Sequence, residues 1–278
     1  MKKLPVRLLG GCLCSMLLLS TDSCRKAEDL GSGLQNGDKD LGQCAIQTMT
    51  LPLDTGYPPP FLTFAYNSAK DPVSVTMTTG LYSRNFANWL FSYDKKGRLS
   101  QYVTVLPSGP IESWDIYFYD GNNRIIGDST YTGGFSGQRA AAPYQYYTQL
   151  YYDHLNRIVK TFQTQGSGST SFEYTYNAAG NLTSTLLINN HSVPDSFKTD
   201  VPGYVNRISV LLTNKIWRFL ARDYSVNSRS DATSYNEAGL PTVFSGRNGI
   251  DIATLFFGSS PGLGLDIQYD CPDQHTGK

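Results

Sequence analysis

The chain has 278 residues, with 23 basic and 23 acidic residues and a formal net charge of zero. This charge balance argues against nucleic acid as a partner. The length is enough for one sizeable hydrophobic core, and all-β domains often reach this length as a single unit.

The first residues have the features of a lipoprotein signal peptide, predicted here as residues 1–23. A basic start, MKKLPVR, precedes the mainly apolar LLGGCLCSMLLLS and then TDSC, which is the order typical of a secretory signal. The apolar run is shorter than the roughly 20 residues that span a bilayer. Cys24 lies at the usual distance from the start and is the predicted lipidation site. Cys12 has the better local lipobox, and a secretory signal cut near Ser23 without lipidation is a further alternative.

Residues 24–43 are charged and rich in glycine, and they lack apolar periodicity. This composition predicts a flexible tether, followed by a single β domain at residues 44–278. The charged residues directly behind Cys24, from Arg25 to Asp29, resemble the export signal of surface-displayed lipoproteins in some Gram-negative bacteria. A simple solvated linker is the alternative. The expected location is the bacterial outer membrane or cell surface, with the membrane as a partner through the lipid anchor.

A nine-residue pattern recurs along the chain. FSYDKKGRL (91–99) is followed by YFYDGNNRI (117–125), LYYDHLNRI (150–158), YTYNAAGNL (174–182) and TSYNEAGLP (233–241), with weaker copies at 64–72 and 197–205. An Asp or Asn that bonds the backbone two residues on favours a type I turn. The Gly or Asn three residues later accepts the left-handed conformation that completes a hairpin loop. The predicted turn-forming residues are Asp94, Gly97, Asp120, Asn123, Asp153, Asn156, Asn177, Gly180, Asn236 and Gly239.

The pattern aromatic-x-Tyr-Asp-x-x-Gly-Arg-Leu resembles the YD repeat of RHS and teneurin-type proteins, and residues 60–271 carry it in patches. The chain is also similar to uncharacterised bacterial surface lipoproteins built from such hairpins, which often end in a strand closing on Tyr-x-Cys, as IQYDC (267–271) does. The resemblance implies a fold of antiparallel hairpins. It implies no specific activity, and the irregular spacing of the copies differs from the regular register of large YD-repeat shells.

The segments between the repeats complete the predicted fold. WDIYFYD (114–120) and YQYYTQLYYD (144–153) are apolar on both faces, which indicates a sheet that curls around an interior. Residues 206–224 have apolar positions at three- and four-residue steps, which predicts one helix; a strand pair is the alternative. Residues 243–257 are predicted to form a further hairpin. The expected fold is all-β: an antiparallel meander of YD-like β-hairpins, curled into a roll or near-closed barrel.

Cys44 and Cys271 lie at the two ends of the ordered sequence. In an oxidising compartment, two such cysteines are expected to form a disulfide, although two unpaired thiols are the alternative. The disulfide would place the first strand beside the last. The three histidines, His154, His191 and His275, are not at metal-ligand spacing, so no metal or cofactor is predicted.

The sequence gives few leads to function. Trp89, Trp114 and Trp217 are the leading candidates for stacking on a ligand, because flat rings offer apolar faces to sugars, although strand packing alone also explains many aromatic residues. Asp115, Asp120, Glu173 and Asp251 are candidate carboxylates for a glycosidase, but no sequence feature brings them together. The interpretation is therefore a lipid-anchored protein, not an enzyme, with a binding or structural role and a glycan or protein ligand. A protein-docking element and a glycoside-active enzyme remain alternatives.

Overall fold

The computed structural model describes residues 44–52, 59–78, 87–106, 108–134, 144–190, 193–201, 203–246, 251–257 and 264–271. All of these residues belong to one compact unit, Asp38–Lys278. Cys24, the predicted signal peptide and the predicted tether lie outside the described residues.

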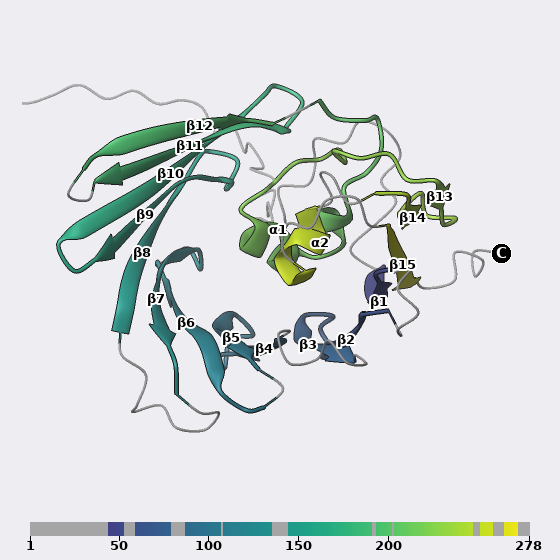
Figure 1. Ribbon diagram of the computed structural model, residues 1–278, viewed down its shortest axis with the longest axis horizontal. Coiled ribbons are helices and arrows are strands. Elements are labelled where there is room, and N and C mark those ends of the chain that lie inside the picture. The colour runs from purple at the N-terminus through teal and green to yellow at the C-terminus, as the bar shows by residue number, and fades with distance from the viewer. Residues whose placement is uncertain are drawn as a thin grey trace, which may run out of the picture. The chain divides into compact units, whose positions relative to one another are not determined.

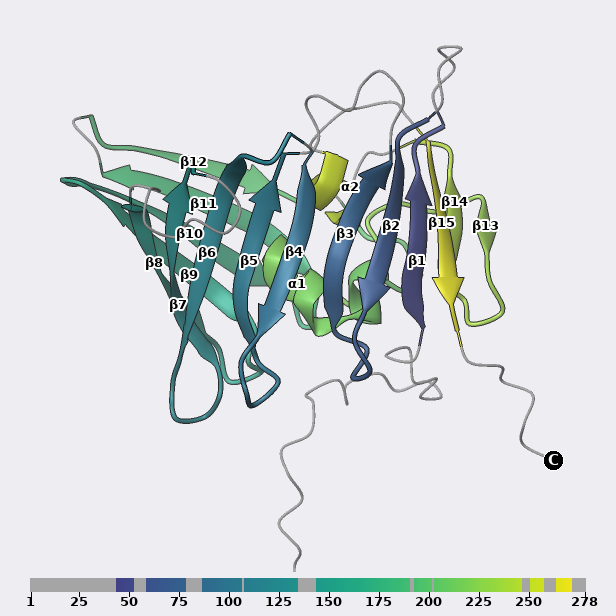
Figure 2. The same cartoon turned by 90° about the horizontal axis from the view of Figure 1, so that it is seen from below.

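One antiparallel sheet of 15 strands forms the framework of this unit, as Figures 1 and 2 show. Its strand order is β12-β11-β10-β9-β8-β7-β6-β5-β4-β3-β2-β1-β15-β14-β13. The strands are β1 (Ala45–Thr50), β2 (Phe61–Tyr66), β3 (Pro72–Thr78), β4 (Asn88–Tyr93), β5 (Leu99–Val105), β6 (Ile111–Tyr119), β7 (Ile125–Thr132), β8 (Tyr144–Tyr152), β9 (Ile158–Gln165), β10 (Gly168–Tyr176), β11 (Leu182–Asn190), β12 (Asp195–Asp200), β13 (Ser234–Tyr235), β14 (Pro241–Phe244) and β15 (Leu265–Asp270).

The predicted all-β meander is confirmed, because β1 to β12 pair in chain order and only β13 to β15 return to the other side of β1. The sheet curves around the short helices α1 (Lys215–Ala221) and α2 (Asp251–Phe257), as Figure 1 shows. The 3-10 helix η3 (Val210–Thr213) precedes α1 in the chain. The sheet does not close, since β12 and β13 are its two edge strands.

The helix predicted at 206–224 is present as η3 and α1, separated by Asn214. The Asn214 side chain caps α1 by accepting a hydrogen bond from the Ile216 backbone N–H at 2.9 Å. The hairpin predicted at 243–257 is wrong, because residues 251–257 form α2. Ile252, Ala253, Phe256 and Phe257 of α2 are all buried, and their three- and four-residue spacing is helical.

The hairpin turns have the geometry that the repeat predicts. At the first copy, the Gly97 N–H donates to the Asp94 carbonyl (2.9 Å), and the Asp94 N–H donates to the Arg98 carbonyl (2.8 Å). Asp94 Oδ1 also accepts from the N–H groups of Lys96 and Arg98. All five predicted left-handed positions have positive φ: Gly97 (73°), Asn123 (61°), Asn156 (56°), Gly180 (81°) and Gly239 (81°).

The two weaker copies behave differently. The copy at 64–72 forms the same turn, with Lys70 at φ 61° and Asn67 accepting from the N–H groups of Ala69 and Asp71. The copy at 197–205 forms no such hairpin, because β12 ends at Asp200 and the chain continues into η3 and α1.

The recurring tyrosine of the pattern has a role beyond strand propensity. Its hydroxyl donates to the carbonyl of a residue on the preceding copy or strand, which ties successive hairpins together. Tyr119 bonds Leu99 and Tyr152 bonds Ile125, each at 2.6 Å. The same bond is made by Tyr66 to Ile46 and by Tyr93 to Pro72. Two tyrosines outside the copies' tyrosine position make a similar bond, Tyr204 to Leu182 and Tyr269 to Pro241. Two tyrosines of the pattern depart from the series. The Tyr176 hydroxyl lies 3.4 Å from the Arg222 carbonyl, and the Tyr235 hydroxyl donates to Asp231 Oδ1.

Arginines reinforce the same contacts between neighbouring repeats. The Arg98 guanidinium pairs with Asp94 at 2.7 Å and lies 4.1 Å from the centre of the Tyr119 ring. Arg157 pairs with Asp153 at 2.7 Å and lies 4.4 Å from the Tyr176 ring. At these two hairpin ends, the Asp and Arg of one copy thus form an ion pair, and the Arg also contacts the tyrosine ring of the following copy.

The left-handed turn positions give a testable expectation for stability. A Cβ at Gly97 would meet nothing within 4 Å, so Gly97→Ala is expected to destabilise only through backbone conformation, by about 1 kcal/mol. Gly97→Asn is the matched control and should cost less, because asparagine already occupies this conformation at Asn123 and Asn156. Urea unfolding of the three proteins checks this order, and equal losses for both variants would contradict it.

Candidate functional site

The three tryptophans lie in different environments. Trp217 of α1 is 0% exposed and Trp89 of β4 is 6% exposed, and both belong to the hydrophobic core. Neither can present a ring to a ligand, so their prediction as ligand-stacking residues is wrong. The error arose because an apolar strand or helix pattern does not show whether its tryptophan packs in the core or faces solvent. Trp114 of β6 is half-buried and lies outside that core.

Strand register places Trp114 on the face of the sheet that points away from the helices. Residues alternate between the two faces of a strand, so Trp114, Ile116 and Phe118 share one face of β6. On the opposite face, the Tyr117 ring packs against Phe219 of α1, with 5.3 Å between ring centres. The Trp114 side is therefore the outer face of the curved sheet, the side away from α1 and α2 in Figure 1.

Two pairs of aromatic rings lie on this outer face. Trp114 pairs with Tyr131 of β7 across the strands, and the ring centres are 6.1 Å apart. Phe118 lies near Tyr147 of β8, also with 6.1 Å between ring centres. Phe118 is 43% exposed, and Tyr151, farther along β8, is 46% exposed. Trp114, Phe118, Tyr131, Tyr147 and Tyr151 are called the outer ring face below.

Gly127 makes room for the second ring pair. It pairs with Phe118 on one side and Gln149 on the other. A Cβ at Gly127 would lie 2.7 Å from Tyr147 Oη and 2.6 Å from the Thr148 carbonyl oxygen. The missing side chain lets the Tyr147 ring extend over β7 toward Phe118. Alternation along β8 puts Tyr147 and Tyr151 on one face, but nothing in the sequence pairs them with Phe118.

Polar groups accompany the rings. The Tyr151 hydroxyl donates to Gln149 Oε1 at 3.0 Å, and Gln149 is exposed. Beside Tyr151, Lys160 of β9 pairs with Glu173 of β10 at 2.8 Å. The surface thus combines flat apolar rings with amide and hydroxyl groups, and the adjacent lysine already has a carboxylate partner.

A second cluster, on the inner face, contains two carboxylates. Thr130 Oγ1 donates to Asp115 Oδ1 at 2.5 Å and lies 3.4 Å from Asp128 Oδ1. Arg222 Nη2 lies 3.8 Å from Asp128 Oδ2. Burial raises the pKa of Asp115 to about 6 and also raises the pKa of Asp128, where the Arg222 charge opposes the rise. Asp128 is 4% exposed. Because Arg222 is the C-cap residue of α1, its ion pair with Asp128 joins β7 to the end of this helix.

The other predicted carboxylates do not join Asp115. Asp120 holds its hairpin turn and pairs with Arg124 at 2.9 Å. Glu173 lies on the outer face and pairs with Lys160. Asp251 begins α2, and its side chain lies outside the described residues. Of the three glycosidase candidates whose side chains the structure describes, only Asp115 is brought beside a second carboxylate, and that partner is Asp128.

The inner cluster predicts a pH effect on stability. The pKa of Asp115 is raised to about 6 from its ordinary value, so its stabilising contribution is present at low pH and is lost as pH rises through 6. Asparagine does not ionise, so Asp115→Asn removes this loss of stability with rising pH. The variant should gain roughly 2–3 kcal/mol of unfolding free energy relative to the wild type between pH 4.5 and 7.5. Denaturant unfolding across this range measures the difference, and a pH-independent difference would contradict the assignment.

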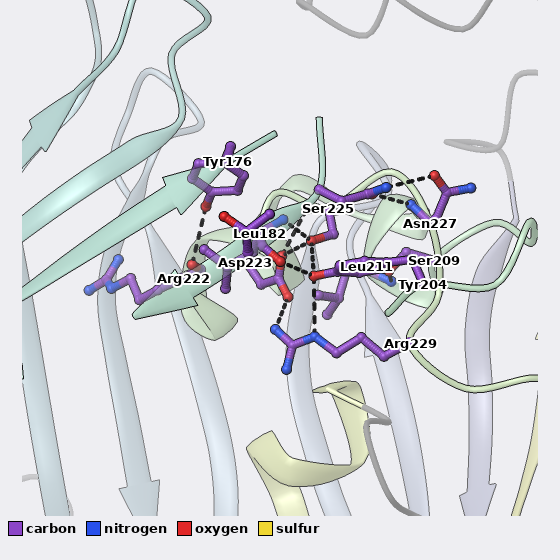
Figure 3. Close-up of polar contacts among 12 residues, drawn as sticks. Tyr176, Leu182, Tyr204, Ser209, Leu211, Arg222, Asp223, Ser225, Asn227 and Arg229 are labelled. Atoms are coloured by element: carbon purple, nitrogen blue, oxygen red, sulfur yellow. Dashed lines mark hydrogen bonds and ion pairs between the residues drawn. The ribbon is translucent and has the colours of Figure 1, made fainter. Parts of the chain in front are cut away.

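A third polar network, shown in Figure 3, joins the segment after α1 to β11. Asp223 is 2% exposed and accepts hydrogen bonds from Arg229 Nη2 and Ser225 Oγ, each at 2.5 Å. Ser225 Oγ lies 2.9 Å from the Tyr204 hydroxyl, which donates to the Leu182 carbonyl at 2.7 Å. Groups of the chain itself occupy these polar atoms, which gives the network a structural role.

The remaining features concern metals and membranes. Among the described residues, no group of three or more His, Cys, Asp or Glu side chains is arranged to hold a metal ion. In the same part of the chain, no helix has the length and apolar character needed to cross a membrane.

No protein-family model and no curated protein matches the chain. Among solved structures, it is similar to a chain of the TcdB2-TccC3-Cdc42 crystal structure, with a TM-score of 0.32 and 14% identity over 72% of this chain and 11% of that chain. It is also similar to a porin-like protein from Bacteroides uniformis, with a TM-score of 0.45 and 10% identity over 82% of this chain and 96% of that chain. The chain thus spans only about a tenth of the first of these.

Proposed function

We propose that the protein is a lipid-anchored protein of the bacterial cell envelope that binds a glycan, without catalysis, on its outer ring face. The anchor is proposed on Cys24 and the signal-like sequence before it. The composition of residues 24–43 predicts a flexible tether, which would give the β domain a reach of roughly 25 Å from the membrane.

The observation that carries the binding role is the gathering of aromatic rings on one outer face. The C–H face of a pyranose ring packs on a flat aromatic ring, and nearby amides and hydroxyls bond its hydroxyl groups. The outer ring face offers both, with Phe118 and Tyr151 each more than two-fifths exposed and Gln149 beside them. A glycosidase needs carboxylates beside the bound sugar. Asp115 and Asp128 lie on the opposite face of the sheet from the rings, which supports binding without catalysis as the role of the outer ring face.

A glycan array with the full-length protein, followed by calorimetric titration, tests the proposal. Wild-type protein should bind at least one glycan, and Trp114→Ala should weaken the affinity about tenfold or more, equal to about 1.4 kcal/mol. The matched control is Phe197→Ala, which removes a ring that is 66% exposed on β12, away from the outer ring face. This control should bind as the wild type does.

Each other outcome has a distinct meaning. Binding that survives Trp114→Ala unchanged would remove Trp114 from the site. An array without any bound glycan would contradict the glycan role, and the exposed rings would then fit a protein-docking surface.

A further inference from the structure

We infer that the ligand of the outer ring face is an extended, uncharged glycan that lies along β6 and β7 and contacts both ring pairs at once. This inference rests on the proposed function and specifies the ligand class of the same site.

The positions of the two ring pairs set the length of the ligand. Trp114 and Phe118 are four residues apart on β6, which corresponds to about 13 Å along the strand. Their partners across the sheet, Tyr131 and Gly127, have the same separation on β7. This distance exceeds the length of two linked pyranose rings. A ligand that contacts both pairs therefore needs at least three to four sugar residues.

On β7, the residues of this face next to Tyr131 are small, Ser129 and Gly127. Ile116 and Ser129 lie directly opposite one another between the two pairs. Ser129 is 9% exposed, so its small side chain does not project above the sheet. The surface between the two ring pairs, from Trp114 to Phe118 on β6 and from Tyr131 to Gly127 on β7, is called the strip below. Gly127 has no side chain, and the Tyr147 ring lies above it at the Phe118 end of the strip. The direction of the strip is that of the strands.

The charges around the strip favour an uncharged ligand. Beside Tyr151 of the outer ring face, Lys160 is held by Glu173 at 2.8 Å, and an acidic glycan would compete with this ion pair. Sulfated or uronic-acid polymers therefore lack a favourable partner at this position.

The test uses calorimetric titration of the full-length protein with neutral linear oligosaccharides of two to six residues, from the glycan types that the array identifies. Affinity should rise at least tenfold between the disaccharide and the tetrasaccharide, and then level off. Uronic-acid oligomers of equal length should bind more weakly. Equal affinity for all lengths, or tighter binding of the acidic oligomers, would overturn this inference and leave the proposed function intact.

Single and double variants sharpen the length test. With the hexasaccharide, Trp114→Ala and Phe118→Ala should each weaken binding, and their effects should multiply in the double variant, because the two sites are well separated. With the disaccharide, each single variant should abolish one of two independent sites and halve the stoichiometry. A disaccharide that binds once, and is lost completely in either single variant, would show a compact site instead of the strip. Circular dichroism of each variant confirms folding, and Phe197→Ala remains the control.

Discussion

Trp217→Ala is expected to lower the free energy of unfolding by about 3–5 kcal/mol. Trp217 is 0% exposed, and its ring meets those of Phe64, Phe91 and Phe256 edge to face at 5.7, 5.8 and 5.7 Å between ring centres. It therefore joins α1 to β2, β4 and α2. Helices of seven residues are not stable alone in water, so loss of this ring should loosen α1 as a whole.

Denaturant unfolding followed by circular dichroism measures this effect without relying on tryptophan fluorescence. Trp114→Ala is the matched control, because it removes the same side chain from the half-buried outer face and should cost clearly less. Equal losses for the two variants would contradict the division between a core tryptophan and a surface tryptophan.

Replacement of both Cys44 and Cys271 by alanine is expected to cost up to about 5 kcal/mol. The two cysteines form a disulfide with 4.1 Å between their Cα atoms, and they are separated by 227 residues in the sequence. A cross-link over so long a loop restricts the unfolded chain strongly. In the folded chain, it adds to the pairing of β1 with β15, where Ala45 lies opposite Asp270.

Urea unfolding of the double variant, compared with wild-type protein treated with a reducing agent, measures this contribution. Both should lose similar stability and keep the native far-ultraviolet spectrum in water, because β1 remains hydrogen-bonded to β2 and β15. A loss below about 1 kcal/mol would show that strand pairing alone holds the two ends together.

The hairpins were predictable from the sequence because their determinants are local. A turn with a short Asp or Asn and a left-handed residue three places later depends on a few neighbouring residues. Asn123 and Asn156 could therefore be assigned without knowledge of the fold. The disulfide was predictable for a different reason, since only two cysteines follow Cys24, the predicted lipidation site.

The errors concern features that depend on distant parts of the chain. Residues 251–257 were expected to form a strand, but α2 buries Ile252 and Phe256 against the sheet. Trp89 and Trp217 were candidates for ligand stacking because no local signal shows which rings the helices cover. The outer ring face was only partly predictable, since the approach of Tyr147 to Phe118 across Gly127 requires the register of three strands.

Oxidative footprinting of the full-length protein, with and without a glycan selected from the array, tests the proposed site most directly. The account predicts that the glycan protects Trp114, Phe118 and Tyr147 from oxidation and leaves Phe197 on β12 unchanged. Unchanged oxidation of all three outer rings at saturating glycan, or protection of Phe197 instead, would contradict a binding site on the outer ring face.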